Sequence, residues 1–169
     1  MCGIAGTAGM RLTPELLDGV TSSLGHRGPD SVGSWSEGEI SLVHTRLKVV
    51  DLSDAAAQPM VDPKTGVVII YNGEIYNCNE LRRNLNHVRF NSHSDTEVIL
   101  NLYLECGIDA VSKLRGMFAF AIWDPRYEVM HLVRDRFGIK PLYVARLGDA
   151  LVFSSEIKGI LAFGIPARL

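Results

Sequence analysis

The stretch Met1-Cys2-Gly3-Ile4-Ala5-Gly6-Thr7-Ala8 opens the chain, and its small apolar residues from Cys2 to Ala8 predict a buried strand. If Met1 is removed, Cys2 carries both a thiol and a free α-amino group. Such an amine has an ordinary pKa of about 7.7–8.0, so about a tenth is neutral at pH 7. A neutral amine can act as the general base for the thiol of its own residue. Cys2 is therefore a candidate nucleophile, while a small buried strand residue remains the other interpretation.

Turn and capping signals divide the rest of the chain into helices and strands. Thr13-Pro14-Glu15 predicts a helix that runs to about Leu24 and stops at Gly25. Asn77 and Ser94 each begin a capping-box spacing and predict two further helices, the second ending near Gly107. A last helix is expected near Glu156. The expected strands, many of them β-branched, are 32–36, 40–45, 67–71, 118–123, 129–133, 142–145 and 151–154.

This order of elements predicts an α+β domain in which mainly antiparallel sheets pack against helices. We expect one folding unit over 169 residues, because no repeat, linker or low-complexity tract divides them. Apolar residues make up 47% of the chain and charged residues 21%, which is typical of a packed globular core.

Composition and charge narrow the classes of partner. A net charge of −2 gives no reason to expect a nucleic-acid or anionic-membrane partner. No apolar run approaches the roughly 20 residues that span a bilayer, and the first residues do not resemble a signal peptide. The odd number of cysteines, Cys2, Cys78 and Cys106, argues against a disulfide framework, so we expect a cytoplasmic setting. Cys78 and Cys106 lie in helical patterns and are interpreted as structural.

Several further segments, in register with Cys2, point to a family. They are Gly25-His26-Arg27-Gly28-Pro29-Asp30, His44-Thr45-Arg46-Leu47, Tyr71-Asn72-Gly73-Glu74-Ile75-Tyr76-Asn77, Ser94-Asp95-Thr96-Glu97, Gly116 to Asp124, Arg134 to Tyr143 and Phe153 to Lys158. Each motif is weak alone, but together and in this order they resemble the class II glutamine amidotransferases. Within that class, the likeness is greatest to the glutaminase domain of glutamine-dependent asparagine synthetases. The resemblance covers nearly the whole chain and implies the N-terminal-nucleophile hydrolase fold, with two mainly antiparallel sheets between helices (αββα).

The resemblance implies that three charged residues bind the two charged groups of free glutamine. Arg46 would hold the α-carboxylate, because a guanidinium can donate two parallel charge-assisted hydrogen bonds. Asp95 and Glu74 would hold the α-ammonium group. Two structural interpretations remain open: Arg46 as a surface residue at a strand end, and Asp95 as an acid that stabilises the first turn of a helix.

The resemblance also assigns the oxyanion donors and a backbone contact. The side chain of Asn72 and the N–H of Gly73 would stabilise the tetrahedral intermediate of acyl transfer. Asn-Gly after an apolar run is otherwise a strong turn signal, and that interpretation stays open. Backbone groups near Val50 would contact the substrate, whereas the side chains of Val49 and Val50 are expected in the core.

Other charged residues receive no catalytic role. His26 lies in an expected loop and is not proposed as the base, because the α-amine of Cys2 has that role. The remaining histidines show no metal-ligand spacing, so no metal site is expected. Arg82-Arg83 and the segment from Arg134 to Lys140 are interpreted as solvated, positively charged faces.

The function implied is hydrolysis of L-glutamine to L-glutamate and ammonia through a γ-glutamyl thioester on Cys2. Residues 1–169 would form a single glutaminase domain that needs no cofactor. The ATP-dependent synthetase domain is expected to be absent from the chain, because no Gly-rich phosphate loop occurs, and ATP and magnesium belong to that part. Ammonia would pass to a synthetase domain or a separate subunit, against which Phe163, Ile165 and segment 134–143 are candidate docking residues. A homo-oligomer is possible.

Two alternatives remain. The chain could act on another amide, although Arg46 together with Asp95 favours a free amino acid. It could also be a non-catalytic glutamine-binding or structural subunit, which would not need a nucleophile.

Overall fold

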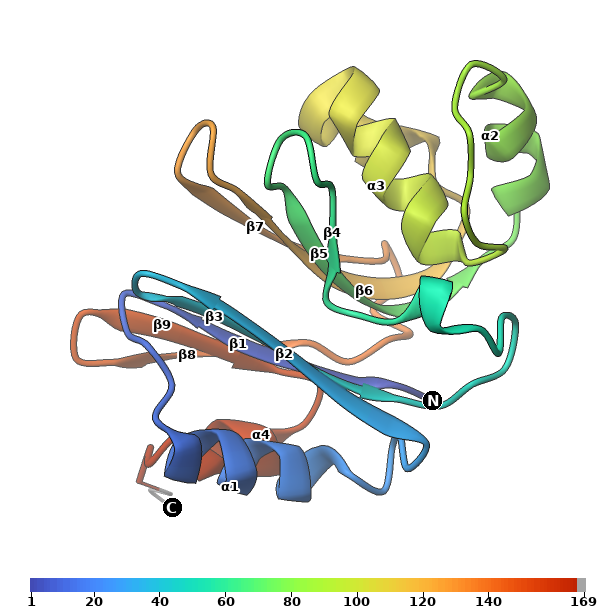
Figure 1. Cartoon of the computed structure of the whole chain (residues 1–169). Helices are drawn as coiled ribbons and strands as arrows, with labels where there is room; N and C mark the ends of the chain where they lie inside the picture. The colour runs from blue at the N-terminus through green and yellow to red at the C-terminus, as the bar shows by residue number, and fades with distance from the viewer. Residues whose placement is uncertain (167–169) are drawn as a thin grey trace.

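The computed structural model describes residues 1–166, so residues 167–169 of the predicted domain lie outside the described part. Two antiparallel sheets are stacked face to face, and helices cover the outer face of each (Figure 1). The first sheet has the strand order β2-β3-β1-β9-β8. Its strands are β1 (Gly3–Ala8), β2 (Ser31–Glu37), β3 (Ile40–Arg46), β8 (Tyr143–Leu147) and β9 (Ala150–Ser154).

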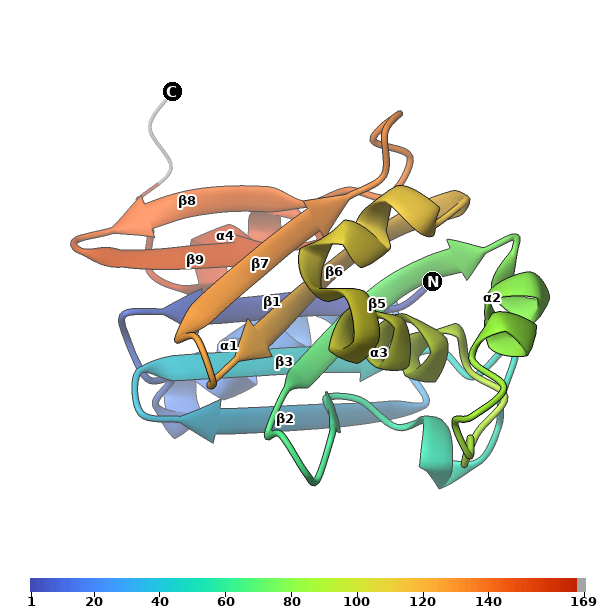
Figure 2. The same ribbon diagram turned by 90° about the horizontal axis from the view of Figure 1, so that it is seen from above.

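The second sheet has the order β4-β5-β6-β7, and its strands cross those of the first sheet when seen from above (Figure 2). Its strands are β4 (Met60–Val61), β5 (Val68–Ile75), β6 (Gly116–Asp124) and β7 (Val129–Arg134). Helices α1 (Pro14–Leu24) and α4 (Ile157–Ala162) cover the first sheet, and α2 (Cys78–Asn84) and α3 (Asp95–Cys106) cover the second (Figure 1). Two 3₁₀ helices complete the described elements, η1 (Asp54–Ala56) and η2 (Gly107–Lys113).

Three apolar layers hold this arrangement together. One lies between the first sheet and its helices, and includes Val20, Leu24 and Val152. Another lies between the second sheet and α2 and α3. The middle layer joins the two sheets, where buried residues from β1, β3, β5, β6 and β9 meet: Ile4, Leu42, Val68, Ile70, Ala119, Ala121 and Phe153. The layers confirm the predicted α+β class with sheets between helices.

Most predicted boundaries agree with the structure to within a few residues. The hydroxyl of Thr13 accepts the N–H of Leu16 over 3.3 Å at the start of α1, as the cap predicts. Ser94 likewise caps α3 by accepting the N–H of Glu97 over 3.3 Å. The predicted cap at Asn77 is wrong, although α2 does begin there. The Asn77 side chain instead donates to the carbonyl of Lys113 and accepts the N–H of Arg115.

The largest difference concerns β5, which was expected to end at Tyr71 but continues to Ile75. Asn72 and Gly73 pair with Ala119 and Phe118 of β6, so the turn interpretation of Asn-Gly is wrong. A side chain at residue 73 would overlap the backbone of β6, so this position needs a glycine for space rather than for a turn.

No helix among the described residues is long and apolar enough to cross a membrane.

Candidate active site

Side-chain alternation along three strands directs the predicted site residues into the space between the sheets. Successive residues of a strand point to opposite faces, so positions two apart share a face. Ile4, Leu42 and Ile70 belong to the layer between the sheets. Arg46 on β3 and Asn72 and Glu74 on β5 follow the same alternation, as does Cys2 directly before β1, so all four project from the inner faces of the sandwich at its end.

At this end of the sandwich the apolar layer gives way to a pocket of about 340 Å³. The N-terminus of the chain lies at the start of β1 (Figure 1), and Met1 and Cys2 both line the pocket. All seven predicted site residues contribute to the lining: Cys2, Arg46, Val50, Asn72, Gly73, Glu74 and Asp95. Segments that are far apart in the sequence therefore meet around the candidate nucleophile.

Cys2 is half-buried at the start of β1 and is held by backbone contacts. Its Sγ lies 3.4 Å from the backbone nitrogen of Leu47, which donates to it, and 3.7 Å from the carbonyl oxygen of Leu47. The backbone carbonyl of Cys2 accepts a hydrogen bond from Nε of Arg27 over 2.9 Å. Because both sides of the residue are tied, the thiol has a fixed position at the pocket wall.

Arg46 is buried at the end of β3, with only 5% of its surface exposed, so the surface interpretation is wrong. Its Nη2 donates to the carbonyls of Asp51 and Ser53 over 2.8 and 3.0 Å. Among the described residues, its side-chain hydrogen bonds involve Nη2 alone, which leaves Nε and Nη1 free to bind a carboxylate. Asp51 is itself held by hydrogen bonds from Ser53 and from the N–H of His93. The same hydrogen bonds lower its pKa to about 2, so its carboxylate is ionised.

The side-chain amide of Asn72 is a buried hydrogen-bond donor that lines the pocket. The residue is 2% exposed, and its Nδ2 has no hydrogen-bond partner among the described residues. Leaving a buried amide donor unsatisfied costs about 1–3 kcal/mol, so such groups are rare unless a ligand completes them. The unpaired donor lies in the same pocket as the Cys2 thiol.

Asp95 is the first residue of α3 and joins that helix to β5. Its Oδ2 accepts the N–H of Ile75 over 2.8 Å and the hydroxyl of Tyr71 over 3.2 Å. Burial, and then the Asp95 carboxylate, raise the pKa of Tyr71, so the phenol remains a donor. Asp95 therefore has a structural contact at the helix start and also lines the pocket, so the two interpretations are compatible.

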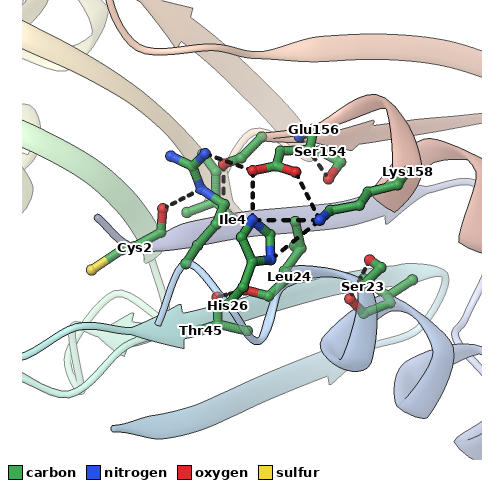
Figure 3. A network of polar contacts seen from close by, with 12 residues as sticks. Cys2, Ile4, Ser23, Leu24, His26, Thr45, Ser154, Glu156 and Lys158 are labelled. Carbon is green, nitrogen blue, oxygen red and sulfur yellow. Dashed lines mark hydrogen bonds and ion pairs between the residues drawn. The ribbon is translucent and has the colours of Figure 1, made fainter. Parts of the chain in front are cut away.

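A polar network next to Cys2 gives Arg27 a role that was not predicted from the sequence. Glu156 accepts hydrogen bonds from Nη1 of Arg27 over 2.8 Å and from His26 over 3.0 Å, and pairs with Lys158 over 3.3 Å (Figure 3). Burial opposes ionisation of Glu156, but these hydrogen bonds outweigh it and lower its pKa to about 2. The negative charge of Glu156 thereby orients the guanidinium that binds the Cys2 carbonyl.

Some expectations are wrong about burial. The side chains of Val49 and Val50 are 71% and 66% exposed rather than in the core, because the loop after β3 extends over the pocket. Lys140 was assigned to a solvated face but is 5% exposed and lines the pocket. Phe163, a candidate for an exposed docking patch, is buried beneath α1 and α4 at 2% exposure.

Gln58 lines the pocket without having been predicted. Its amide oxygen accepts the N–H of Tyr71 over 2.6 Å, and its amide nitrogen donates to the hydroxyl of Thr96 over 2.9 Å. Gln58 lies in an irregular segment, so neither periodicity nor a capping signal distinguishes it. Within residues 1–166, no three His, Cys, Asp or Glu side chains lie close enough to hold a metal ion.

Comparison with known proteins places the chain in a family. Residues 1–167 match the family described as the glutamine amidotransferase domain. The chain belongs to this family. A glutamine-hydrolysing asparagine synthetase 3 of Bacillus subtilis (strain 168) is 41% identical over 179 residues, covering 100% of this chain and 29% of that protein. Amidase chry2 of Gibberella zeae is 37% identical over 154 residues, covering 89% of this chain and 23% of that protein.

A solved structure shows the same fold for this amidotransferase domain. The glutamine phosphoribosylpyrophosphate amidotransferase of B. subtilis, complexed with ADP and GMP, matches with a TM-score of 0.83 at 24% identity, over 96% of this chain and 44% of that one. The expected N-terminal-nucleophile hydrolase fold is thereby confirmed. The domain spans less than a third of the two curated relatives named above.

Proposed function

We propose that this domain hydrolyses L-glutamine to L-glutamate and ammonia through a γ-glutamyl thioester on Cys2. The main support is one juxtaposition: the thiol of Cys2 and the buried, unpartnered amide of Asn72 line the same pocket. Acyl transfer needs a nucleophile and a donor aimed at the developing oxyanion, and these two groups provide that pair.

The reaction begins after removal of Met1. The α-amine of Cys2 takes the thiol proton, and the thiolate attacks the δ-carbonyl carbon of glutamine to form a C–S bond. The side-chain amide of Asn72 and the N–H of Gly73 donate to the oxyanion. As the tetrahedral intermediate collapses, the C–N bond breaks, and the protonated amine gives its proton to the leaving nitrogen, which departs as ammonia.

Hydrolysis of the thioester completes the cycle. The neutral α-amine removes a proton from water as the water attacks the thioester carbonyl. The C–S bond then breaks, glutamate leaves, and the thiol of Cys2 recovers a proton. Every step uses groups of this chain and water, so the proposed half-reaction requires no metal or organic cofactor.

The charged walls of the pocket support a free amino acid as the substrate. The unpaired nitrogens of Arg46 suit the α-carboxylate, while Asp95 and Glu74 suit the α-ammonium. Val50 lines the same pocket, where we propose that backbone groups near it contact the substrate. A relative bears the name amidase, but an N-acylated substrate would lack the ammonium group that the two carboxylates attract.

The released ammonia would serve an asparagine-synthetase-like reaction. Support comes from the 41% identity to a protein named as a glutamine-hydrolysing asparagine synthetase, of which this domain spans 29%. We propose that a synthetase domain or separate subunit, with ATP and magnesium, accepts the ammonia.

The proposal is tested by intact mass before and after treatment with 6-diazo-5-oxo-L-norleucine, followed by a glutamate-release assay. Loss of Met1, one adduct on Cys2 and none on Cys2→Ala would support the reaction. Processed protein that binds glutamine but neither reacts nor turns it over would instead favour the non-catalytic glutamine-binding alternative. Turnover of N-acylated amides in preference to glutamine would favour the other-amide alternative.

A further inference from the structure

The loop between β7 and β8 reverses the usual preference for burying apolar side chains. Phe137 is 85% exposed and Ile139 is 55% exposed, whereas Lys140 beside them is only 5% exposed. Lysine is almost never fully buried unless its charge is paired. The conformation of this loop therefore directs an ammonium group inward, into the wall of the Cys2 pocket.

Asp135 holds the loop in this conformation. Its buried carboxylate accepts the backbone N–H groups of Phe118, Phe137, Ile139 and Lys140 over 3.3, 3.1, 3.0 and 2.9 Å. Burial opposes ionisation of Asp135, but these hydrogen bonds outweigh it and lower its pKa. On the other side, Nε of Arg134 donates to the carbonyl of Lys140 over 2.7 Å. The backbone of Lys140 is thus fixed from two directions.

The ammonium group itself has a weak partner. Its Nζ lies 2.9 Å from Sδ of Met1, and a thioether is a poor acceptor for a cation. Within residues 1–166, Lys140 forms no ion pair with a carboxylate. Burying an unpaired charge is costly, so the surroundings are expected to compensate it. The residue that Lys140 contacts is also the one whose removal creates the α-amine of Cys2.

The charged groups around Cys2 come from several of the elements that border the pocket. Burial, and then the nearby Arg27, lower the pKa of Lys140, while Glu74, Asp135 and Cys2 act in the opposite direction. The charged or titratable side chains facing this region are Arg27 before β2, Arg46 on β3, Asp51 after β3, Tyr71 and Glu74 on β5, Asp95 on α3 and Lys140 before β8.

We propose that Lys140 is an electrostatic residue of the active site: once Met1 is removed, its ammonium group stabilises the Cys2 thiolate and disfavours protonation of the new α-amine. This inference rests on the proposed function, since it concerns the same nucleophile. One positive charge produces both effects, because it favours a nearby anion and disfavours a second nearby cation. Both effects lower the pKa of the group concerned. In this role Lys140 acts on the nucleophile through the electric field of its ammonium group.

The test measures how fast iodoacetamide alkylates Cys2 as a function of pH, followed by intact mass on protein that has lost Met1. The variants are Lys140→Met, which removes the charge at similar length, and Lys140→Arg, which keeps it. Arg136→Met is the matched control, because it removes one positive charge from an exposed position of the same loop. Cys78→Ser and Cys106→Ser in all backgrounds restrict the reaction to Cys2.

Lys140→Met is expected to raise the pH midpoint of alkylation by about 0.5–1 unit, the shift expected from one charge several ångströms away. At pH 7 this corresponds to a roughly 3- to 10-fold slower reaction. Lys140→Arg should restore most of the shift, and Arg136→Met should leave the midpoint within about 0.2 unit because its exposed charge is screened. The acid limb of kcat/KM for glutamine should move in parallel.

An unchanged midpoint in folded Lys140→Met would overturn the inference and leave Lys140 a structural residue. If Lys140→Met does not fold, as judged by circular dichroism, Lys140→Gln replaces it under the same criterion. Alkylation does not require glutamine. A shifted midpoint in protein that does not hydrolyse glutamine would therefore support the role of Lys140 while rejecting the glutaminase reaction.

Discussion

The guanidinium group of Arg27 donates from Nε to the backbone carbonyl of Cys2 over 2.9 Å. Its Nη1 donates to Glu156 over 2.8 Å, so the start of β1 is connected through Arg27 to the residue that precedes α4 (Figure 3). A nucleophile positioned by such a chain is sensitive to the side chain that orients the guanidinium. Glu156 lies on the far side of Arg27 from the pocket and is not expected to contact glutamine.

Glu156→Gln is therefore expected to lower kcat for glutamine hydrolysis by roughly 10-fold, because a shift of the nucleophile affects the reacting geometry. KM should change less than about 2-fold, since the substrate-binding side chains are untouched. Steady-state kinetics measures both constants. Lys158→Met is the control, because that exposed lysine pairs with Glu156 and has no role in holding Cys2. Its kcat should stay within about 2-fold of the wild-type value, since exposed ion pairs contribute little. A larger effect from Lys158→Met would contradict the proposed chain of contacts.

Asn72→Ala removes the unpartnered amide and is expected to lower kcat by about 100- to 1,000-fold, with little change in KM, because the amide acts only in the transition state. Loss of a burst of ammonia release that the wild type shows would indicate that the acylation step is the one that slows. Asn101→Ala is a matched control, since that amide donates to the carbonyl of Glu97 within α3 and lies outside the pocket. Equal losses in the two variants would mean that Asn72 has only a structural role.

The alternation of residues between strand faces explains how much of this site could be predicted. Arg46 and Asn72 lie on regular strands and Cys2 directly precedes one, so a period of two places their side chains once the sheets are known. What the pattern could not supply was where β5 ends, because Asn72-Gly73 also has the composition of a turn. Pairing with β6 decides in favour of a strand, and that pairing is a tertiary property.

Irregular segments account for what could not be predicted. Lys140 belongs to a charged stretch whose composition is typical of a solvated face, and its burial depends on four backbone groups gathered by Asp135. Gln58 enters the pocket from a segment with no periodicity, and its amide bridges Tyr71 and Thr96. Neither arrangement follows from local sequence, because the partners come from different parts of the chain.

Arg46→Lys tests how the α-carboxylate is bound. A lysine keeps the charge but has donors on one nitrogen alone, so it cannot bind the carbonyls of Asp51 and Ser53 and also offer the separate N–H groups of Nε and Nη1 to a carboxylate. KM for glutamine is expected to rise about 10- to 100-fold, with kcat changed less than about 3-fold, because ground-state binding is what weakens. A fall in kcat at unchanged KM would instead assign Arg46 to the chemical step. Glutamine amide analogues without the α-carboxylate should lose less affinity in the variant than glutamine does.

His44 provides a prediction about stability and pH. It is fully buried between the sheets, and burial lowers its pKa from 6.5 to about 3, although the backbone of Tyr71 acts in the opposite direction. Since the unfolded chain binds a proton near pH 6.5 and the folded chain does not, folding is favoured above that pH. This contribution to stability is lost as pH falls from about 6.5 towards 3, at up to about 1.4 kcal/mol per pH unit.

Urea unfolding of the wild type and of His44→Phe at pH 7 and pH 4.5 isolates the contribution of His44 to the pH dependence of the free energy of unfolding. Phenylalanine matches the ring in shape and carries no titratable group, so the other ionisable residues cancel in the comparison. The wild type should lose about 2 kcal/mol more than the variant between the two pH values, because only its unfolded state gains the imidazolium proton. An equal loss in both proteins would mean that folded His44 is protonated in this range and has a partner at one of its ring nitrogens.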